Sequence, residues 1–597
     1  MSASASGCGR APLYGSVAAL LRLYRSGELS PVEVARDLLD RIDAHESALH
    51  CFVTLTPEVA LERARIAEAQ WRRGDAPPLA GVPYGLKDVI ATAGIRTTGQ
   101  SRLLEHHVPD ADSAVEARLK ATGAVLMGKL TTYEFAHGGP SWDLPWPPAM
   151  NPWKTGYLPG STSSGAGAAL AAGLLPAAIG TDTGGSIRMP ASVCGVVGLK
   201  PTYGRVSRRG VLPNTYTFDC CGPMARTVED VALLLQAICG VDDADPSSAR
   251  DPVPDFGERL GRDLAGLRVG WVRHWYEGDP SCHPDIPPAM EAALRVLEDA
   301  GARVEEIRLS DLLVYQDCKT TISITEMFSA YEHAFRTRPH DLGLMFRNKV
   351  IAGALIRAED YFQALRQRLW LSRELARAFA DVDLIASPAW MTPAEPARPD
   401  VNDRFLRPPN ITTPFNVGGG PAISLPCGLT RDGLPLGLQL AAAPMNEPVL
   451  LQAAHAYQLA TDWHRRVPPV EGRLQQPMPP AGPLPPPTAV ARPPQAEPRS
   501  FVQDGGGTAT LAALPASTPE EIVRMAGAAG LDLPPALMQE LCTAWPAFEA
   551  MVRRLPRDRA RFDEPAHHAL APARVAALDP APASGARATP DFPCPGD

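Results

Sequence analysis

The sequence predicts an α/β protein in which one large domain is followed by a small helical unit. Three observations predict this architecture. Short apolar runs bounded by glycine alternate with helical patterns over most of the chain, the same alternation returns late in the sequence, and a proline-rich stretch then precedes two further helical segments.

The first segment, from Tyr14 to about Arg72, has a helical pattern. Ser30-Pro31-Val32-Glu33 forms a capping box with proline at the first helical position, which predicts a helix that begins at Pro31. The apolar residues that follow recur at helical spacing: Val32, Val34, Ala35, Leu38, Leu39 and Ile42.

The apolar runs beyond this segment indicate buried strands. Gly81 to Leu86 and Ala124 to Gly128 are such runs, and a helical pattern from Ser113 to Thr122 lies between them. The same texture returns at Asp383 to Ala386 and at Gly433 to Ala443. We therefore expect segments before and after the middle of the chain to join one sheet.

A proline-rich stretch follows between about Val467 and Ser500, where twelve prolines occur with almost no large apolar residue. Proline cannot donate to a strand ladder, so this stretch is predicted to be an extended tether. The predicted organisation is a large domain over residues 1–469, a linker over 470–506, a small helical accessory unit over 507–580 and a disordered tail over 581–597.

The accessory unit is predicted to contain two helices. Thr518-Pro519-Glu520-Glu521 is a second capping box, and it opens a helix that ends near Gly530. Asp532 precedes a longer helix, whose apolar residues recur at helical spacing: Leu537, Leu541, Trp545, Phe548 and Met551. Two helices make a poor core, so we expect this unit to dock on the large domain, with Trp545 and Phe548 as packing residues.

Composition excludes several classes of protein. The 57 Lys and Arg residues against 66 Asp and Glu residues give a net charge of −9, so nucleic-acid binding is not expected. The eleven cysteines are odd in number and form no CxxC pair, which argues against zinc or a disulfide framework. Because the N-terminus lacks an apolar leader and no apolar run reaches about 18 residues, we expect a cytoplasmic protein without a membrane span.

Two loops rich in serine and glycine, at residues 159–167 and 179–188, lie about one helix apart. No lysine follows the first loop as in a phosphate-binding loop, and Leu170 occupies the last glycine position of a dinucleotide fingerprint. Arg188 stands where a nucleophile elbow around Ser186 would need glycine. Phosphate binding, dinucleotide binding and a Ser-His-Asp hydrolase of that type are thereby excluded.

What remains is a serine in a glycine-rich loop, whose backbone N–H groups can bind a developing oxyanion. This arrangement suits acyl transfer. Serine needs a base, and without a placed histidine the Ser-Lys variant is the chemical alternative. Lys87 follows an apolar strand-like run, where burial disfavours its charged form and allows it to accept a proton.

Four motifs in order resemble those of the amidase signature family: Gly85-Leu86-Lys87-Asp88, the first serine-rich loop, Gly180 to Arg188, and Cys194 to Thr202. The resemblance covers about residues 13–469. It implies a single α/β/α domain around a large mixed sheet and a Ser-cisSer-Lys triad that hydrolyses amide C–N bonds without a metal or an organic cofactor. By position it implies Ser186 as the nucleophile, Lys87 as the base and an oxyanion hole made of the amides of Thr183, Gly184, Gly185 and Ser186.

The relay residue departs from the family pattern. The family's bridging serine lies 24 positions before the nucleophile, and Thr162 occupies that position here. A threonine hydroxyl can relay a proton, but its extra methyl constrains χ1 and crowds the cis peptide that the family has there. We expect Thr162 to be the relay, with Ser163 as the alternative.

Other residues near the motifs remain open at this point. Asp182 and Arg188 are similar to invariant positions of the family motif, and they either form an ion pair that braces the loop or contact the substrate. The adjacent pair Cys220-Cys221 has diverging side chains, which favours packing or pocket lining. The sequence does not say whether His137 and Asp219 approach the site.

The C-terminal unit, about Thr508 to Pro572, resembles the small accessory subunit of bacterial carboxybiuret hydrolase, itself related to the C subunit of the tRNA-dependent amidotransferase. The resemblance rests on two capped helices followed by Arg561-Phe562-Asp563-Glu564-Pro565-Ala566, and it implies that a normally separate subunit is fused here.

Three functions follow as hypotheses. The first is hydrolysis of a carbon–nitrogen bond in a small amide or urea-like substrate, with release of ammonia or an amine. The alternative is the glutamine-hydrolysing A subunit of a tRNA-dependent amidotransferase, and a non-catalytic scaffold would follow only if Thr162 is disabling. The expected partners are a small-molecule amide, the chain's own accessory unit and a second copy in a homodimer, with no cofactor or metal.

Overall fold

A computed structural model describes residues 15–398, 409–469, 497–502 and 510–557. Its centre is a twelve-stranded sheet with the order β1-β3-β2-β4-β6-β5-β10-β11-β9-β7-β8-β12. The strands are β1 (Phe52–Leu55), β2 (Pro83–Lys87), β3 (Val125–Leu130), β4 (Ala177–Asp182), β5 (Val197–Lys200), β6 (Cys220–Ala225), β7 (Arg268–Trp271), β8 (Arg303–Arg308), β9 (Leu384–Pro388), β10 (Ala422–Leu429), β11 (Pro435–Ala442) and β12 (Arg499–Ser500).

The sheet is mixed, which confirms the α/β class and the large mixed sheet that the family resemblance implied. Parallel pairs such as β2 with β4 and β7 with β9 occur together with antiparallel pairs such as β10 with β11. The late strands β9 and β11 join the same sheet as the early strands β2 and β3, as their shared sequence texture predicted.

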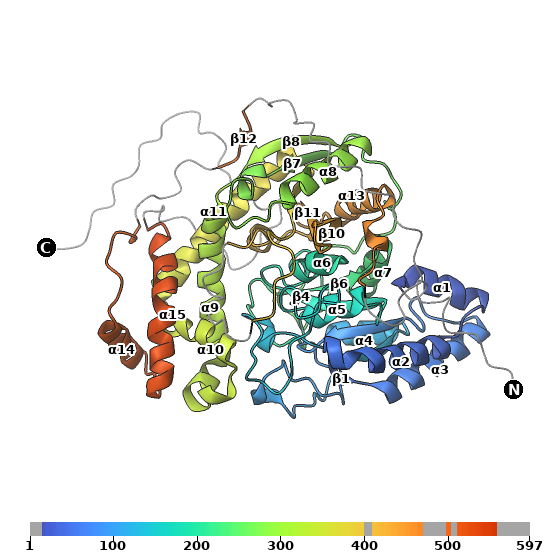
Figure 1. Ribbon diagram of the computed structural model, residues 1–597, viewed down its shortest axis with the longest axis horizontal. Coiled ribbons are helices and arrows are strands. Elements are labelled where there is room, and N and C mark those ends of the chain that lie inside the picture. The colour runs from blue at the N-terminus through green and yellow to red at the C-terminus, as the bar shows by residue number, and fades with distance from the viewer. Residues whose placement is uncertain (1–14, 399–408, 470–496, 503–509, 558–597) are drawn as a thin grey trace.

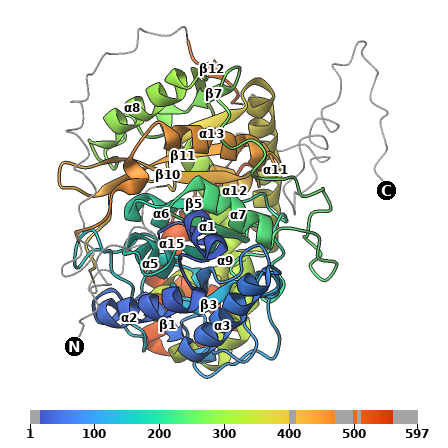
Figure 2. The ribbon, with the colours of Figure 1, turned by 90° about the vertical axis from the view of Figure 1, so that its right-hand side faces the viewer.

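Helices cover both ends of this sheet (Figure 2): α2 and α3 lie near β1 and β3, while α8 lies near β7 and β12. The helices are α1 (Val17–Ser26), α2 (Pro31–Leu49), α3 (Pro57–Arg73), α4 (Ala114–Ala121), α5 (Ser164–Ala171), α6 (Arg188–Cys194), α7 (Val228–Ile238), α8 (Ile286–Asp299), α9 (Leu312–Thr337), α10 (Leu344–Val350), α11 (Ala358–Asp381), α12 (Pro414–Val417), α13 (Glu447–Leu459), α14 (Pro519–Ala528) and α15 (Pro535–Arg554). Within the described segments, no helix is both long and apolar enough to cross a membrane.

Both predicted capping boxes are present. Ser30 and Glu33 exchange side-chain and backbone hydrogen bonds at the start of α2, and Thr518 and Glu521 do the same at the start of α14. The longer C-terminal helix begins at Pro535, three residues later than Asp532, because Pro534 holds the extended conformation that precedes the first turn.

The central strands β2 and β4 bring the two predicted catalytic segments to the same side of the sheet, at the carboxyl ends of these strands. β2 and β4 are neighbouring parallel strands, with Leu86 opposite Ile179, and both are fully buried. The carboxyl ends of parallel neighbours open at the same edge. Lys87, at the end of β2, therefore lies beside the loop that follows β4.

The C-terminal unit docks on the large domain, as predicted. Figure 1 shows α15 alongside α9 and α10, on the side of the molecule away from α1 to α3. Trp545 and Phe548 are buried in a cluster that includes Phe346 of α10. A two-pronged ion pair from Arg347 to Glu540, with N–O distances of 2.8 and 2.9 Å, closes the interface.

The predicted linker, residues 470–506, is described only at residues 497–502, and there it is not a free tether. Residues Arg499 and Ser500 form β12, which pairs in parallel with the edge strand β8. The side chain of Arg499 also contacts Glu305 and Asp381. An edge strand offers unpaired N–H and C=O groups, and proline-free residues 499–502 can use them. The motif at 561–566 and the predicted tail 581–597 lie outside the described residues.

Deleting residues 507–597 is expected to lower the free energy of unfolding by several kcal/mol and to reduce solubility. The deletion uncovers the apolar face of α9 and α10, and burial of each large apolar side chain contributes about 1.5–3 kcal/mol. Thermal unfolding and the soluble fraction measure this effect, with Arg524→Ala on the exposed surface of α14 as the control. A truncated chain as stable, soluble and active as the full chain would contradict the docking of the unit.

Candidate active site

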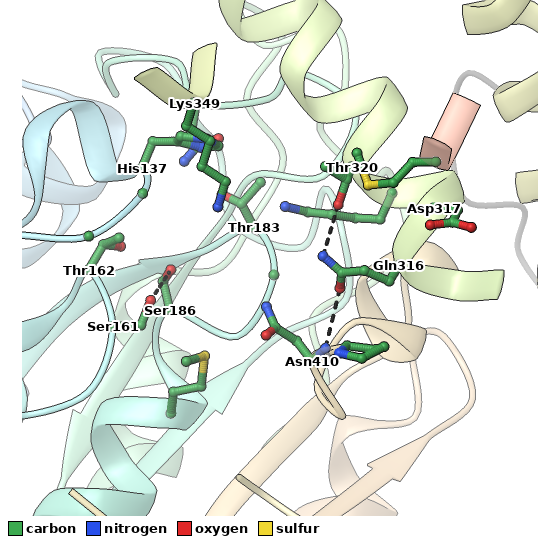
Figure 3. A pocket seen from close by; sticks show the side chains of 18 of the residues that line it. His137, Ser161, Thr162, Thr183, Ser186, Gln316, Asp317, Thr320, Lys349 and Asn410 are labelled. Atoms are coloured by element: carbon green, nitrogen blue, oxygen red, sulfur yellow. Dashed lines mark hydrogen bonds between the residues drawn. The ribbon is translucent and has the colours of Figure 1, made fainter. Parts of the chain in front are cut away.

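A cavity of about 380 Å³ opens where the two serine-rich loops face the long helix α9 and the short helix α10 (Figure 3). Its walls come from several distant parts of the chain. The residues that matter below are Ser161, Thr162, Thr183, Gly184 and Ser186 from the loops, His137 and Asn214 beside them, Asp317 and Lys319 from α9, Lys349 from α10, and Phe548, Met551 and Arg554 from α15.

Lys87 is fully buried at the end of β2. Its Nζ donates to Thr162 Oγ1 at 2.6 Å and to Thr181 Oγ1 at 2.8 Å. Burial lowers the pKa of Lys87 to about 7, although the carboxylates of Asp182 and Asp219 favour the charged form. A substantial fraction of this amine is therefore neutral near pH 7, as a base requires. Sequence reasoning missed Thr181, whose hydroxyl fixes the amine from the β4 side.

The hydroxyls of the first loop point in three directions. Thr162 contacts the Lys87 amine, whereas Ser163 exchanges hydrogen bonds of 3.3 Å with the backbone of Thr181. Ser161, which sequence reasoning missed, places its Oγ 3.2 Å from Ser186 Oγ. Figure 3 shows Ser161, Thr162 and Ser186 together at one end of the cavity. The geometry thus sets Thr162, and not Ser163, against the lysine.

One implied feature of the triad is not present in this structure. The family resemblance implies a cis peptide at the relay residue, but every peptide bond among the described residues is trans. The trans form is the one that a non-proline residue favours, by about 3 kcal/mol.

The loop after β4 supplies the predicted oxyanion donors, with one correction. The amide of Gly185 donates to Asp182 Oδ1 at 2.8 Å and is therefore already used within the protein. Gly185 has a φ of +119°, which glycine adopts without strain and other residues rarely do. The amides of Thr183, Gly184 and Ser186 have no acceptor among the described residues, so they remain the candidate donors to an oxyanion.

Asp182 and Arg188 form a buried ion pair that braces this loop. The guanidinium contacts both carboxylate oxygens, at 3.0 Å through Nε and 2.8 Å through Nη2, and both residues are fully buried. Although burial alone would raise the pKa of the Asp182 carboxyl, the guanidinium holds it below its usual range. Asn416 and Gln439, which no motif indicated, bind the outer edge of the pair. Neither charge lines the cavity, so bracing, and not substrate contact, is the arrangement observed.

The remaining candidates near the loop differ in position. Asp219 lies beneath the loop and accepts a hydrogen bond of 2.6 Å from the Thr183 hydroxyl. His137 lines the cavity itself. Cys220 and Cys221 are buried in β6, where they pack and do not line the cavity.

The C-terminal helix α15 contributes to the cavity, which the sequence did not reveal. Phe548 and Met551 form part of the wall. Arg554 binds Asp317 of α9 with two hydrogen bonds of 2.6 and 2.7 Å. A residue of the accessory unit therefore fixes a charged side chain at the rim of the site.

The fold, with a large mixed sheet that carries these loops at one edge, is that of the amidase signature enzymes. A sequence profile of the amidase family matches residues 33–451, and the chain belongs to this family. The A subunit of the glutamyl-tRNA(Gln) amidotransferase of Roseiflexus sp. strain RS-1 is 40% identical over 473 residues, which cover 74% of this chain and 96% of the relative.

Solved structures agree with this placement. The native peptide amidase of Stenotrophomonas maltophilia has a TM-score of 0.66 and 31% identity, covering 76% of this chain and 99% of its own. A chain from a vestigial protein complex, described as revealing the evolutionary origins of an s-triazine catabolic enzyme, has a TM-score of 0.68 and 32% identity, covering 74% and 98%. These matches do not test the resemblance of the C-terminal unit to a small subunit, which stays a prediction.

Thr162→Val is expected to lower kcat by about 10²- to 10⁴-fold, the range that general acid–base transfer contributes. The substitution removes the hydroxyl at 2.6 Å from Lys87 Nζ at nearly constant shape. Thr162→Ser is expected to keep or improve turnover, and Ser163→Ala to have a smaller effect than Thr162→Val. Steady-state kinetics measure the ranking. If Ser163→Ala were inactive while Thr162→Val kept a kcat near that of the wild type, the relay role would have to be assigned to Ser163.

The pH profile of kcat/KM is expected to rise about tenfold per unit below pH 7 and then to level. Its cause is the pKa of Lys87, about 7, because the amine accepts a proton only in its neutral form and is protonated below that value. Initial rates between pH 5 and 9, with circular dichroism to verify folding, measure the profile. A constant rate across this range would refute a titrating lysine base.

Proposed function

We propose that this chain hydrolyses the amide bond of a small substrate through an acyl-enzyme on Ser186. The observation that carries the proposal is the buried contact of 2.6 Å between Lys87 Nζ and Thr162 Oγ1 beside the cavity in which Ser186 lies. A buried amine with a pKa near 7 and a hydroxyl in contact with it can move protons at neutral pH.

In the proposed reaction, Ser186 Oγ attacks the amide carbon while its proton passes through Thr162 to Lys87. The oxyanion that forms is held by the amides of Thr183, Gly184 and Ser186. The C–N bond then breaks, the lysine returns the proton to the leaving nitrogen, and ammonia or an amine departs. Water attacks the ester in a second cycle of the same transfers, which releases a carboxylic acid and restores Ser186.

The comparisons support a narrower proposal, hydrolysis of glutamine as one subunit of an amidotransferase, more strongly than a free-standing hydrolase of small amides. The curated relatives are named as the A subunit of the glutamyl-tRNA(Gln) amidotransferase, at 36–40% identity. This chain would then release ammonia from glutamine for a partner protein. The same serine, lysine and threonine would carry out both versions, so the site chemistry does not separate them.

Ammonia release by the purified chain tests the proposal. The panel contains glutamine, biuret derivatives and aryl amides, and Ser186→Ala serves as the blank. We expect release that depends on Ser186 from at least one of them. Turnover confined to glutamine would favour the amidotransferase version, and turnover that persists in Ser186→Ala would overturn the assignment.

A further inference from the structure

One face of α15 forms a wall of the active-site cavity, although this helix belongs to the C-terminal unit. Five of its residues line the cavity that also contains Ser186: Ala547, Phe548, Ala550, Met551 and Arg554. Four of them follow the spacing i, i+3, i+4 and i+7 from Ala547, which is the spacing of a single helix face. The C-terminal unit therefore encloses the site as well as covering the apolar surface of α9 and α10.

Ion pairs toward both ends of α15 fix its position. Near its start, Glu540 binds Arg347 of α10 with two hydrogen bonds. At its last residue, Arg554 binds Asp317 of α9 through both carboxylate oxygens. Two-pronged contacts of this kind fix geometry because both hydrogen bonds must align at once. The cavity-lining face lies between these two anchors, so α15 is a fixed wall.

The face that α15 turns to the cavity is apolar. Phe548 is buried in the cluster between α10 and α15 and supports the wall from behind. Met551 is only partly buried and Ala550 is exposed, so a ligand can reach these two side chains. Arg554, the charged member of the five, is engaged by Asp317. A ligand that extends as far as α15 therefore meets methyl and thioether groups.

The proposed reaction directs the acyl part of a substrate toward this wall. The leaving nitrogen receives its proton through Thr162, so it lies on the Thr162 side of Ser186. Figure 3 shows Thr162 on one side of Ser186 and Asp317, the partner of Arg554, on the other. Because the acyl chain and the leaving nitrogen are opposite substituents of the carbonyl carbon, the acyl chain extends toward α9 and α15.

We propose that α15 sets the longest acyl chain that the site accepts, with Ala550 and Met551 as the residues that determine this specificity. The substrate class is then small amides with a short acyl chain, whose far end packs on a wall supplied by the C-terminal unit. This inference rests on the proposed function at Ser186 and adds a length limit to it. In an apolar pocket, one methylene too many or too few changes kcat/KM by about 10- to 200-fold, so such a wall discriminates strongly.

Straight-chain primary amides, from acetamide to octanamide, measure the limit through ammonia release. In the wild type, kcat/KM should rise as added methylenes are buried, and then fall by about 10-fold or more at the length that meets α15. Met551→Ala removes the heavy atoms beyond Cβ and should move the fall to a longer chain. Ala550→Phe adds a ring at an exposed helix position and should move the fall to a shorter chain.

Ala528→Phe is the matched control, because it adds the same ring at an exposed position of α14, and no described residue of α14 lines the cavity. It should leave the chain-length profile unchanged. The readout is the ratio of kcat/KM between long and short amides, which a loss of folded enzyme does not alter. The same profile in the wild type, Met551→Ala and Ala550→Phe would overturn the inference but not the proposed function. A wild-type profile without a fall up to octanamide would do so too, as would variants that scale the rates of all amides equally.

A labelling assay covers the case in which none of these amides is hydrolysed. Alkanesulfonyl fluorides, from methanesulfonyl to octanesulfonyl fluoride, react with a nucleophilic serine with loss of fluoride and carry the alkyl chain in place of the acyl chain. We expect the rate of labelling of Ser186 to fall at a set chain length, which Met551→Ala and Ala550→Phe move in opposite directions. Identical labelling profiles in the three proteins would overturn the length limit alone. A chain whose Ser186 is not labelled even by methanesulfonyl fluoride would overturn the proposed function and this inference with it.

Discussion

Ser186→Ala is expected to lower amidase activity by about 10⁵-fold or more, the order of loss that follows removal of the nucleophile in serine hydrolases. The cavity offers no equivalent replacement. Ser161 Oγ lies 3.2 Å from Ser186 Oγ, but the hydrogen bonds that Lys87 makes within the described part of the chain go to Thr162 and Thr181 and not to Ser161. Because Ser186 is a small side chain at the cavity surface, the variant should fold and melt like the wild type. Ammonia release measures the loss, and unchanged thermal unfolding serves as the control.

Covalent labelling of the nucleophile can contradict the assignment of Ser186. A sulfonyl fluoride that labels Ser186→Ala as fast as the wild type would show that another residue is the nucleophile. Ser161→Ala is the matched control, since it removes the neighbouring hydroxyl and should leave labelling of Ser186 in place.

Lys87→Arg is expected to lose at least about 10²- to 10⁴-fold in kcat, the contribution of a positioned general base. Arginine keeps the charge but cannot give up its proton near neutral pH. In the wild type, by contrast, burial lowers the pKa of Lys87 to about 7. Steady-state kinetics at pH 7 to 9 measure the loss, which raising the pH should not rescue.

Lys87→Met controls for packing, because it replaces the amine with an apolar chain of similar length. It should be as inactive as Lys87→Arg, and it should fold, since it removes an amine that is costly to bury. Substantial activity in Lys87→Arg near neutral pH would refute the base assignment.

Local signals predicted much of the fold. The capping boxes at Ser30 and Thr518 define helix starts by hydrogen bonds within four residues, so their outcome does not depend on the rest of the chain. The buried runs that became β2 and β3 were visible for the same reason, because a fully buried strand is continuously apolar.

Contacts between distant segments could not be predicted in this way. The pairing of Arg499 with Ile307 depends on where the edge of the sheet lies, and nothing near residue 499 indicates it. The same holds for Arg554, which reaches Asp317 only because α15 packs on α9. Lys319 and Lys349 lie on helices whose patterns indicate only packing, and the cavity they share exists only once α9 and α10 face the loops.

The site residues also fall into two groups: those that local motifs predict and those that depend on contacts between distant segments. Motif order predicted Lys87, Thr162 and Ser186; in the structure Thr162 and Ser186 line one cavity, and the buried amine of Lys87 contacts Thr162. Motif order could not predict that the Gly185 amide donates a hydrogen bond to Asp182, because this bond depends on the turn that the loop adopts. Nor could it predict Asn416, which reaches the Asp182–Arg188 pair from more than 200 residues away.

The central claim is that Ser186 becomes acylated and that Lys87 drives the reaction. Mass spectrometry of the intact protein, quenched in acid during turnover of an activated ester or amide and followed by peptide mapping, tests it most directly. We expect one acyl group on the peptide that contains Ser186, formed in the wild type and absent from Ser186→Ala and Lys87→Met. An acyl group on any other residue, or equal acylation of Lys87→Met, would contradict the claim.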